Sequence, residues 1–376
     1  MKLIHLSDLH IGKKVNEFSM KEDQEYILTK ILNIIDKEKP DAVMIAGDVY
    51  DKSVPSEDAI KVWDNFLLKL ASKKVTILAI SGNHDSAIRF STYNKLIETA
   101  GIYLASGYDG SVEPVVLKDK DGEVNFYMLP FIKPAIVRSF FPDEEINDYT
   151  DACRVAIDKM NIDKSKRNVI IAHQFVIGAS RCESEEVSVG GLDGVSSEVF
   201  EDFDYVALGH IHGKQFIGRE TIRYCGTPLK YSFSEKDHKK TVTIVEMGPK
   251  GSVEIREELL IPKHDMRQIK GTYEELTYKP NYENTATGDY IHAVLTDEED
   301  VLDAMSKLRF IYPNIMKLSY DNKRTRENQD VSDAGDIDNK TPIELFEEFY
   351  EKQNNQPLSD TQKNFVVGLM ESIWEG

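Results

Sequence analysis

Cysteine, long apolar runs and basic charge are all in short supply in this sequence. Its 376 residues include three cysteines (Cys153, Cys182 and Cys225), without the paired spacing of a disulfide framework or a cysteine-type zinc site. We therefore expect a protein of a reducing compartment, the cytoplasm. No apolar stretch reaches the roughly 18 residues that a membrane-spanning helix needs, so no membrane partner is expected. The opening residues, MKLIHLSDLH, contain charge and histidine, unlike a secretory signal.

Basic side chains are outnumbered, with 46 Lys and Arg against 65 Asp and Glu and a formal net charge of −19. This balance argues against a protein that binds nucleic acid through a broad basic surface. A local positive patch or bound metal ions can still offset it. Three short clusters, GKK (12–14), KSKR (164–167) and KDHKK (236–240), fit either contacts to a DNA backbone or ordinary solvated lysines.

The first 260 residues alternate short apolar runs with amphipathic segments. Residues 23–38, DQEYILTKILNIIDKE, place apolar side chains on one helical face, and Pro40 follows. Ser56 is positioned to N-cap a second helix over residues 57–71. Strands are expected in KLIHLSD, DAVMIAGD, VTILAISGNHD, NVIIAHQF and DYVALGHIH, then in TIRYCGTPLKYSF and KTVTIVEMG. The alternation predicts an α/β fold whose strand ends converge on one edge, the usual place for a site.

The pattern changes near residue 262. Over residues 266–320 we expect a small α+β unit with strands at MRQIKGTY, DYIHAVL and NIMKLSY. A helix is expected over residues 297–312, because its acidic start suits the positive end of a helix dipole. Residues 321–340 have almost no apolar side chains and predict a flexible linker. The expected domains are therefore 1–262 and 263–320, followed by the linker and a last element at 341–376.

The last 36 residues predict two short amphipathic helices. Thr341, with Pro342 and Glu344, begins the first, and Ser359 with Gln362 begins the second. Their apolar faces consist of Ile343, Phe346, Phe349 and Tyr350, and of Phe365, Val366, Leu369, Met370 and Ile373. Two short tethered helices are marginally stable alone. They could dock back on the body or, in the interpretation we favour, bind another protein as helix-in-groove anchors.

Five expected strand ends carry residue types that bind metal ions: SDLH, GD, GNHD, AH and GHIH. Because side chains alternate along a strand, Asp8 and His10 project from the same side, as do His210 and His212. Each motif alone is usually a turn or a satisfied histidine. Five in succession at strand ends instead predict one site. The candidate residues are Asp8, His10, Asp48, Asn83, His84, Asp85, His173, His210 and His212.

Two-metal hydrolysis is the chemistry that such a set would serve. Two divalent ions roughly 3.5–4 Å apart can bind a phosphate, activate a water and stabilise the leaving oxygen. A carboxylate can bridge two ions, which suits Asp48. Mixed nitrogen and oxygen donors without a thiolate favour Mn²⁺ or Fe²⁺ over a structural zinc ion.

The order D-x-H … GD … GNHD … H … GHxH resembles the calcineurin-like metallophosphoesterases over roughly residues 1–230. The resemblance implies an α/β, two-sheet β-sandwich flanked by helices and a dinuclear centre, commonly of two Mn²⁺, with Fe²⁺ or Mg²⁺ as alternatives. It implies that His84 faces the scissile phosphate as a catalytic residue and that Asp85 orients it. It further implies that Asp8, His10, Asp48 and His212 hold one ion, and that Asp48, Asn83, His173 and His210 hold the other.

One position departs from part of that family. Some relatives carry a histidine three residues after the bridging aspartate, where this sequence has Asp51. A carboxylate cannot protonate or stabilise a phosphate in the same way at neutral pH. The role of that histidine and the polarity of an exonuclease therefore stay open here, and Asp51 could simply cap the loop before Pro55.

Longer segments resemble, more narrowly, the nuclease subunits of bacterial complexes that pair this fold with a coiled-coil ABC ATPase. These segments are KLIHLSDLHIGK, GDVYDKSVPS, GGLDGVSSEVFEDFDYVALGHIHGKQ and YCGTPLKYSFSE. The resemblance implies a capping domain after residue 262 and helices at 341–376 that grip the coiled-coil base of the ATPase, the only subunit to use ATP. It also implies a homodimer within a heterotetramer that cuts double-stranded DNA ends and hairpins. The alternatives are a phosphatase, a small-molecule phosphodiesterase, or a scaffold that mainly tethers the ATPase.

Overall fold

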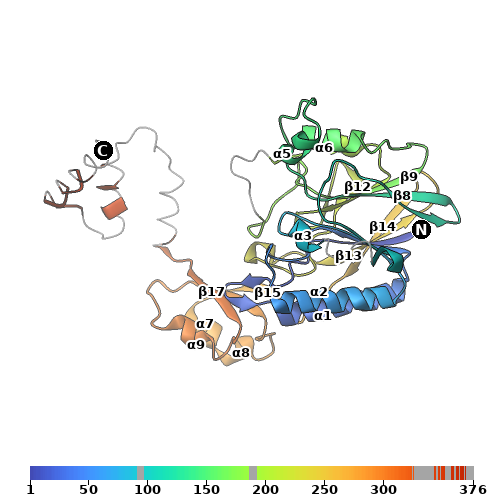
Figure 1. Cartoon of the computed structure of the whole chain (residues 1–376). Helices are drawn as coiled ribbons and strands as arrows, with labels where there is room; N and C mark the ends of the chain where they lie inside the picture. Colours follow the sequence, from blue (N-terminus) through green and yellow to red (C-terminus); the bar gives the residue numbers. More distant parts are fainter. Residues whose placement is uncertain are drawn as a thin grey trace.

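Two six-stranded sheets lie face to face in the computed structural model, with helices on both outer faces (Figure 1). The structure describes residues 1–90, 97–185, 193–323 and 325, together with individual positions between 343 and 369. The first sheet runs in the order β14–β13–β1–β4–β5–β6. Its strands are β1 (Lys2–Leu6), β4 (Ala42–Ala46), β5 (Thr76–Ile80), β6 (Ile102–Ala105), β13 (Thr241–Met247) and β14 (Val253–Leu259).

The second sheet runs in the order β11–β12–β10–β9–β8–β7. Its strands are β7 (Val115–Asp119), β8 (Gly122–Leu129), β9 (Arg167–His173), β10 (Tyr205–Gly209), β11 (Gln215–Ile217) and β12 (Arg219–Tyr224). Strands β1, β4, β5 and β6 pair in parallel in the first sheet, as do β8, β9, β10 and β12 in the second. The carboxyl ends of parallel neighbours meet at one edge, which positions the site described below.

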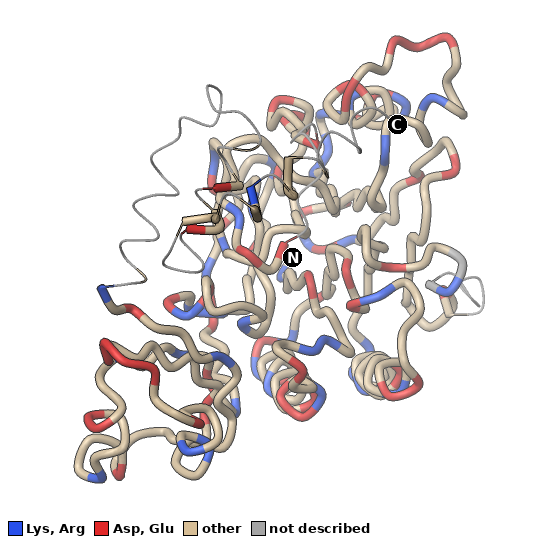
Figure 2. Tube along the Cα trace, turned by 90° about the vertical axis from the view of Figure 1, so that its left-hand side faces the viewer, with Lys and Arg blue, Asp and Glu red and all other residues tan. Residues whose placement is uncertain are grey.

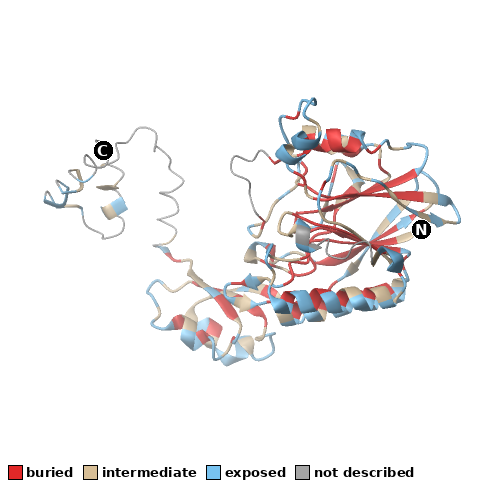
Figure 3. Cartoon of the chain, viewed as in Figure 1, coloured by how far each residue is buried: buried red, intermediate tan, exposed pale blue. Residues whose placement is uncertain are grey.

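Three apolar layers hold this sandwich together (Figure 3). Side chains such as Leu78 and Phe126 fill the space between the sheets. Helices α1 (Lys21–Glu38) and α2 (Glu57–Ser72) cover the first sheet, and α5 (Pro134–Phe140) and α6 (Tyr149–Asp158) cover the second. The predicted two-sheet α/β sandwich is confirmed. The shorter elements are β2 (Lys14–Val15), β3 (Phe18–Ser19), α3 (Ala87–Phe90), η1 (Glu98–Ala100), η2 (Ser197–Phe200) and η3 (Phe233–Glu235).

The predicted early helices and strands are found where their sequence signals stand. The Ser56 hydroxyl accepts a hydrogen bond from the Ala59 amide at 3.2 Å, so the expected N-cap of α2 is present. All seven expected strand segments of the sandwich contain strands. No prediction covered β6, β7, β8, β11 and β14, which complete the two sheets, or α5 and α6, which form the outer layer of the second.

A third, parallel sheet of β15 (Met266–Gly271), β16 (Tyr290–Leu295) and β17 (Ile315–Tyr320) forms a separate unit (Figure 1). Helices α7 (Tyr273–Thr277), α8 (Lys279–Tyr282) and α9 (Ala304–Leu308) accompany it. Its own apolar cluster includes Ile291, Leu308 and Ile315, so this unit has a core of its own.

The helix predicted over residues 297–312 is wrong in length, because only Ala304–Leu308 is helical. The acidic segment before it makes tertiary contacts instead. The Asp297 carboxylate accepts a hydrogen bond from the Tyr273 amide, and the Val301 amide donates to the Tyr320 hydroxyl. Asp303 then adopts a left-handed backbone, with φ +54°. Such a residue cannot continue a right-handed helix, so α9 begins after it.

A buried carboxylate joins this unit to the sandwich. Asp23 of α1 is fully buried, and its Oδ2 accepts a hydrogen bond from the Tyr290 hydroxyl of β16 at 2.6 Å. Its Oδ1 accepts from the His264 amide at 3.0 Å, and its Oδ2 lies 3.1 Å from His264 Nδ1. A single α1 side chain therefore anchors both the connecting segment and the first residue of β16.

The final element is described only at separate positions. Thr341, Pro342 and Glu344, and nearly all of the predicted linker, lie outside the described residues. The predicted start of the second helix is confirmed, since the Gln362 amide donates to Ser359 Oγ and the Ser359 amide to Gln362 Oε1. Among the described residues, no helix combines the length and the apolar character needed to span a membrane.

Candidate metal centre

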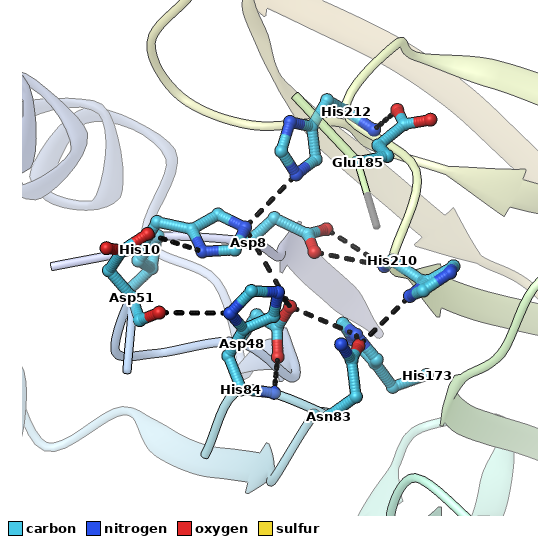
Figure 4. Close-up of polar contacts among 12 residues, drawn as sticks. Asp8, His10, Asp48, Asp51, Asn83, His84, His173, Glu185, His210 and His212 are labelled. Atoms are coloured by element: carbon cyan, nitrogen blue, oxygen red, sulfur yellow. Dashed lines mark hydrogen bonds and ion pairs between the residues drawn. The ribbon is translucent and has the colours of Figure 1, made fainter. Parts of the chain in front are cut away.

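The predicted site residues meet where the carboxyl ends of strands from both sheets face one another (Figure 4). The segments after β1, β4 and β5 contribute from the first sheet, and the ends of β9 and β10 contribute from the second. Three overlapping groups of potential ligands lie within 4.8 Å. They are Asp8, His10 and His212; His10, Asp48 and His84; and Asp8, Asp48 and His173.

Asp48 occupies the middle of this cluster. Its Oδ2 lies 3.4 Å from His173 Nε2 and 3.8 Å from both His10 Nε2 and His84 Nε2. Its other oxygen, Oδ1, accepts a hydrogen bond from the His84 backbone amide at 2.9 Å. One carboxylate oxygen is thus fixed by the backbone while the other faces imidazoles on two sides, as a bridging ligand would.

Asn83 connects two histidines of the second sheet. Its Oδ1 lies 3.0 Å from His173 Nε2 and 3.1 Å from His210 Nδ1. The other ring nitrogen of His173 donates to the Ala46 carbonyl at 2.8 Å, which leaves Nε2 as the atom that faces the cluster. Together with Asp48, these three residues form the half of the centre predicted for a second ion.

Asp8, His10 and His212 form the other half. The Nε2 atoms of His10 and His212 lie 3.1 Å apart. The Asp8 carboxylate accepts from the His210 backbone amide at 3.0 and 3.1 Å, so it also ties β1 to the end of β10. Asp8 lies near both halves, because it forms a potential ligand group with Asp48 and His173 as well.

The backbone around the cluster is unusual. Asp8, His10, Asp48 and His210 all have positive φ, of 51°, 44°, 49° and 99°. L-residues rarely adopt this region, and such outliers gather at functional sites. Close approach also requires glycine at position 82, where an added Cβ would lie 2.1 Å from Asp48 Oδ1. The local chain is therefore shaped to bring ligand side chains together at some conformational cost.

The charge of the cluster is concentrated on His173 and Asp48. Burial is the largest influence on the pKa of His173 and lowers it, but the Asp48 and Asp8 carboxylates and the hydrogen bond to Ala46 together raise that pKa to about 9. Burial would raise the pKa of Asp48, yet His173 and the other imidazoles lower it below its usual range. Burial lowers the pKa of His210 to about 3 and that of His10 well below its usual value. A cation bound here would displace the His173 proton.

The donor set fits two divalent cations. Imidazole nitrogens, carboxylates and one amide oxygen converge without a thiolate, which is the ligand chemistry of Mn²⁺ or Fe²⁺. Two imidazole nitrogens at 3.1 Å must either share a proton or turn lone pairs toward a common ion. Among the described residues, buried His10 Nδ1 has no hydrogen-bond partner. The residues present therefore suit the dinuclear centre that the motifs predicted.

His84 lies at the open side of the cluster, with 17% of its side chain exposed. Its Nδ1 donates to the Asp51 backbone carbonyl at 2.9 Å, which leaves Nε2 facing Asp48. At 3.8 Å from Asp48 Oδ2, His84 is also near enough to join the ligand set. Its assignment to the phosphate rather than to a metal stays a prediction.

Asp85 binds backbone amides around the site. Its Oδ2 accepts from the amides of Val49 and Gly82, and its Oδ1 accepts from that of Tyr50, at 2.9–3.1 Å. Burial raises its pKa to about 6, with Asp48 contributing. The contacts found for Asp85 join the loops after β4 and β5, and its predicted effect on the His84 ring stays a prediction.

Asp51 contributes to the site in a way that its sequence position did not reveal. Its carbonyl accepts from His84, while its carboxylate lies 2.8 Å from Lys13 Nζ and 3.7 Å from His10 Nδ1. The side chain that replaces the histidine of some relatives thus pairs with a lysine beside the cluster.

Side chains from residues 182–185 and 227–240 contact the ring Nδ1 and the backbone of His212. Sequence reasoning missed these residues. The hydroxyl of Ser184 lies 2.7 Å from His212 Nδ1, and Glu185 accepts from the His212 amide at 2.6 Å. Glu235 lies fully buried beside Ser184. The only sequence signal was that Glu235 ends one of the segments that carried the family resemblance.

The basic clusters suspected of DNA contacts are largely engaged within the protein. Arg167 is 3% exposed and pairs with Asp119, and Lys240 is 7% exposed and pairs with Glu235. Lys164 and Lys166 pair with Asp202 and Glu123. Arg167 and Lys240 are therefore buried ion-pair partners and fit neither alternative, whereas Lys164 and Lys166, which are 72% and 44% exposed, fit ordinary solvated lysines.

Comparison with known proteins places these findings in context. The family described as "Calcineurin-like phosphoesterase" matches residues 1–214, and the family described as "Type 5 capsule protein repressor C-terminal domain" matches residues 262–354. A solved structure of a dimetal phosphatase from Danio rerio is similar over 69% of this chain and 96% of its own, at 11% identity and a TM-score of 0.40.

Two curated relatives are similar over their full length. The SbcD subunit of the nuclease SbcCD from Staphylococcus epidermidis is 32% identical over 99% of this chain and 99% of its own. The corresponding nuclease subunit from Staphylococcus saprophyticus is 31% identical over 100% of this chain and 99% of its own. The narrower resemblance drawn from the four sequence segments is thereby confirmed.

Proposed function

The chain belongs to the calcineurin-like phosphoesterases and, within them, to the SbcD family of nuclease subunits, and from this premise we propose how it acts. It is a metal-dependent phosphodiesterase. In our proposal it uses two Mn²⁺, Fe²⁺ or Mg²⁺ being the alternatives, to cut DNA as a double-strand exonuclease and a single-strand and hairpin endonuclease. It does so in the cytoplasm with an SbcC-type ATPase, in DNA end processing, repair and recombination.

The observation that carries the proposal is the position of Asp48 Oδ2, 3.4–3.8 Å from imidazoles contributed by both sheets. Asp8, His10, Asp48 and His212 would hold one ion, and Asp48, Asn83, His173 and His210 would hold the other. Once bound, the two ions would bind the phosphate, activate the attacking water and stabilise the leaving oxygen.

The chain's own residues supply orientation and a proton. The Asp51 carbonyl fixes the His84 ring through Nδ1, so Nε2 is directed into the cluster and available to a phosphate. In its imidazolium form, which carries a proton on Nε2 as well as on Nδ1, His84 can then stabilise the developing charge or protonate the leaving oxygen. Asp85 keeps the loops after β4 and β5 together, which fixes the backbone that presents both Asn83 and His84.

Exposed apolar side chains in the final element support the nuclease over a free-standing phosphatase. The final element presents exposed aromatic and aliphatic side chains, with Phe349 59%, Phe365 70% and Leu369 51% exposed. An amphipathic helix pair of this kind suits a groove or coiled coil of another protein. We propose that it binds the coiled-coil base of the ATPase, which alone uses ATP, within a heterotetramer built on a homodimer.

The charge distribution fits a subunit that shares its DNA contacts. Lys and Arg are interspersed with Asp and Glu over the molecule (Figure 2), and the net charge is −19. Sequence-independent DNA binding depends on basic contacts to phosphates. We therefore propose that the ATPase supplies much of the DNA-binding surface and that this subunit alone binds DNA weakly.

The central experiment assays purified protein on a hairpin DNA with MnCl₂, with and without the ATPase subunit and ATP, beside a generic phosphatase substrate. Hairpin cleavage that requires Mn²⁺ and is stimulated by the ATPase and ATP supports the proposal. Hydrolysis of the generic substrate without DNA cleavage would instead identify a phosphatase. DNA tethering without any hydrolysis would identify a scaffold.

The His84→Ala substitution tests the role of the exposed histidine. It should abolish cleavage while two Mn²⁺ remain bound. The rate should fall at least about 100-fold, because that is the usual contribution of a general acid or base. Cleavage comparable to wild type would remove His84 from the mechanism. Loss of an ion would instead assign it to the ligand set.

Deletion of residues 341–376 tests the partner contact. The shortened chain should retain its Mn²⁺ and no longer co-purify with the ATPase subunit. A complex that survives the deletion would show that the ATPase is held by another surface.

A further inference from the structure

We infer that Ser184 and Glu235 are positioning residues that hold His212 in the one ring orientation and tautomer able to bind a metal ion. This inference rests on the proposed metal centre and concerns residues outside its ligand set. Neither the family match nor the sequence motifs assign a role to either residue.

The ring of His212 is held through its outer nitrogen. Ser184 Oγ lies 2.7 Å from His212 Nδ1 and 2.7 Å from Glu235 Oε1. An ionised carboxylate only accepts hydrogen bonds, so the serine hydroxyl donates to Glu235. Its oxygen is then left to accept from His212 Nδ1–H. The lone pair of His212 therefore resides on Nε2, the atom 3.1 Å from His10 Nε2 in the centre.

Glu235 is built to remain an acceptor. It is fully buried, and both oxygens of its carboxylate accept hydrogen bonds. The Tyr231 amide and the Ser232 hydroxyl reach Oε1 at 3.1 and 3.2 Å, and the Lys240 ammonium binds Oε2. A buried carboxylate with a cationic partner and several donors is stabilised in its charged form. Ser184 accordingly has one consistent hydrogen-bond direction.

The same residues also fix the backbone of His212. The Glu185 carboxylate accepts from the His212 amide at 2.6 Å, and Lys240 Nζ donates to the His212 carbonyl at 2.9 Å. The contacts therefore close a ring, from the imidazole through Ser184, Glu235 and Lys240 back to the His212 carbonyl. No other predicted ligand is held at the ring, the amide and the carbonyl by side chains in the described part of the chain.

Such outer contacts usually determine how tightly a histidine binds a metal. A partner that orients the ring and fixes its tautomer is typically worth 10- to 100-fold in metal affinity. Removing the Ser184 hydroxyl would free the His212 ring to rotate and to place its proton on Nε2. The effect should fall on the ion bound by Asp8, His10, Asp48 and His212, and the other ion should be retained.

The test measures Mn²⁺ binding to the full-length chain by calorimetry and by metal analysis after gel filtration. Ser184→Ala should weaken one of two Mn²⁺ sites about 10- to 100-fold. Ser184→Thr, which keeps the hydroxyl, should restore it. Ser180→Ala is the matched control, because Ser180 is a serine four residues earlier on the same loop and does not contact His212. Glu235→Gln should resemble Ser184→Ala, since its amide can donate to Ser184 and reverse the hydrogen bond.

The outcomes separate this inference from the proposed function. Two Mn²⁺ bound by Ser184→Ala as tightly as by wild type would overturn the inference and leave the metal centre standing. Equal weakening of both sites, or no rescue by Ser184→Thr, would also overturn it, because either result indicates general loosening. Wild-type protein that binds no divalent ion would overturn the proposed function itself. Circular dichroism and thermal unfolding establish that each variant is folded.

Discussion

The Gly209→Ala substitution is expected to damage the fold and the metal centre together. Gly209 ends β10, immediately before His210, and faces β4 across the sandwich. An added Cβ would lie 1.8 Å from the Ala46 carbonyl oxygen and 2.7 Å from His173 Nδ1. Real Cβ atoms essentially never approach such atoms within 3.0 Å. The two strands would have to separate by about 1 Å. The nearest atom is a backbone carbonyl oxygen, which cannot move aside as the end of a flexible side chain could.

The cost can be bounded from the geometry. Overpacking in a well-packed core typically costs 1–3 kcal/mol, and a backbone clash of this size belongs at the upper end, about 3 kcal/mol. For a domain of roughly 150–250 residues this lowers Tm by about 6–12 °C. The hydrogen bond between Ala46 and His173 lies at the clash, so His173 and its bond to Asn83 should shift too. Mn²⁺ affinity should fall with stability.

Urea and thermal unfolding, with Mn²⁺ calorimetry, measure both effects on the same sample. Gly288→Ala is the matched control, since nothing lies within 4 Å of its added Cβ, and it should change stability by less than about 0.5 kcal/mol. A Gly209→Ala protein with the Tm and Mn²⁺ affinity of the control would refute the proposed close approach of the two sheets at the site.

Three further outcomes are expected. Chelation of divalent ions should lower Tm, and Mn²⁺ at about 100 times its Kd should restore about 2.7 kcal/mol for each ion bound; an unchanged Tm would contradict metal binding to the folded state. Asp23→Ala should cost about 1–3 kcal/mol and speed proteolysis near Lys263, because it leaves the Tyr290 hydroxyl unpaired, and unaltered cleavage would contradict the anchoring role. Hydrogen bonds from Arg167 hold the pKa of Asp119 below its usual range. The ionised carboxylate therefore adds to the free energy of unfolding above about pH 4, and this stabilisation is lost as the pH falls further. Asp119→Asn should therefore flatten the acid-induced fall in unfolding free energy in urea titrations, and an equally steep fall would argue against it.

The residues predicted for the centre could be selected from the sequence because each follows an apolar strand. A buried run that ends in Asp48 or His173 leaves a local signal, and five such signals in order specify a sheet edge. Ser184 and Glu235 leave no such signal, since each lies away from the strand ends and contacts His212 only after the chain has folded. Their role follows from tertiary contacts alone.

Local signals also misled where tertiary contacts outweighed them. The acidic run at 297–300 has the composition of a helix start, but Asp297 accepts from Tyr273 in a neighbouring helix and Asp303 is left-handed. The segments that form β7, β8, α5 and α6 produced no prediction. Strand β7 is an edge strand, partly exposed along its length, and in its sheet it pairs with β8 alone.

The centre lies across the interface of two sheets, and this arrangement couples its geometry to core packing. Asp8 and Asp48 come from the first sheet, whereas His173 and His210 come from the second. Several contacts tie the sheets at that point, among them those from the His210 amide to Asp8 and from His173 Nδ1 to the Ala46 carbonyl. The separation of the sheets is otherwise set by the volume of side chains such as Phe126. Since protein interiors are close-packed, a change in side-chain volume in that layer should alter the distances between predicted ligands, even where the changed side chain contacts none of them. Metal affinity should therefore respond to substitutions in the inter-sheet core more strongly than to equally destabilising ones beneath α1 and α2.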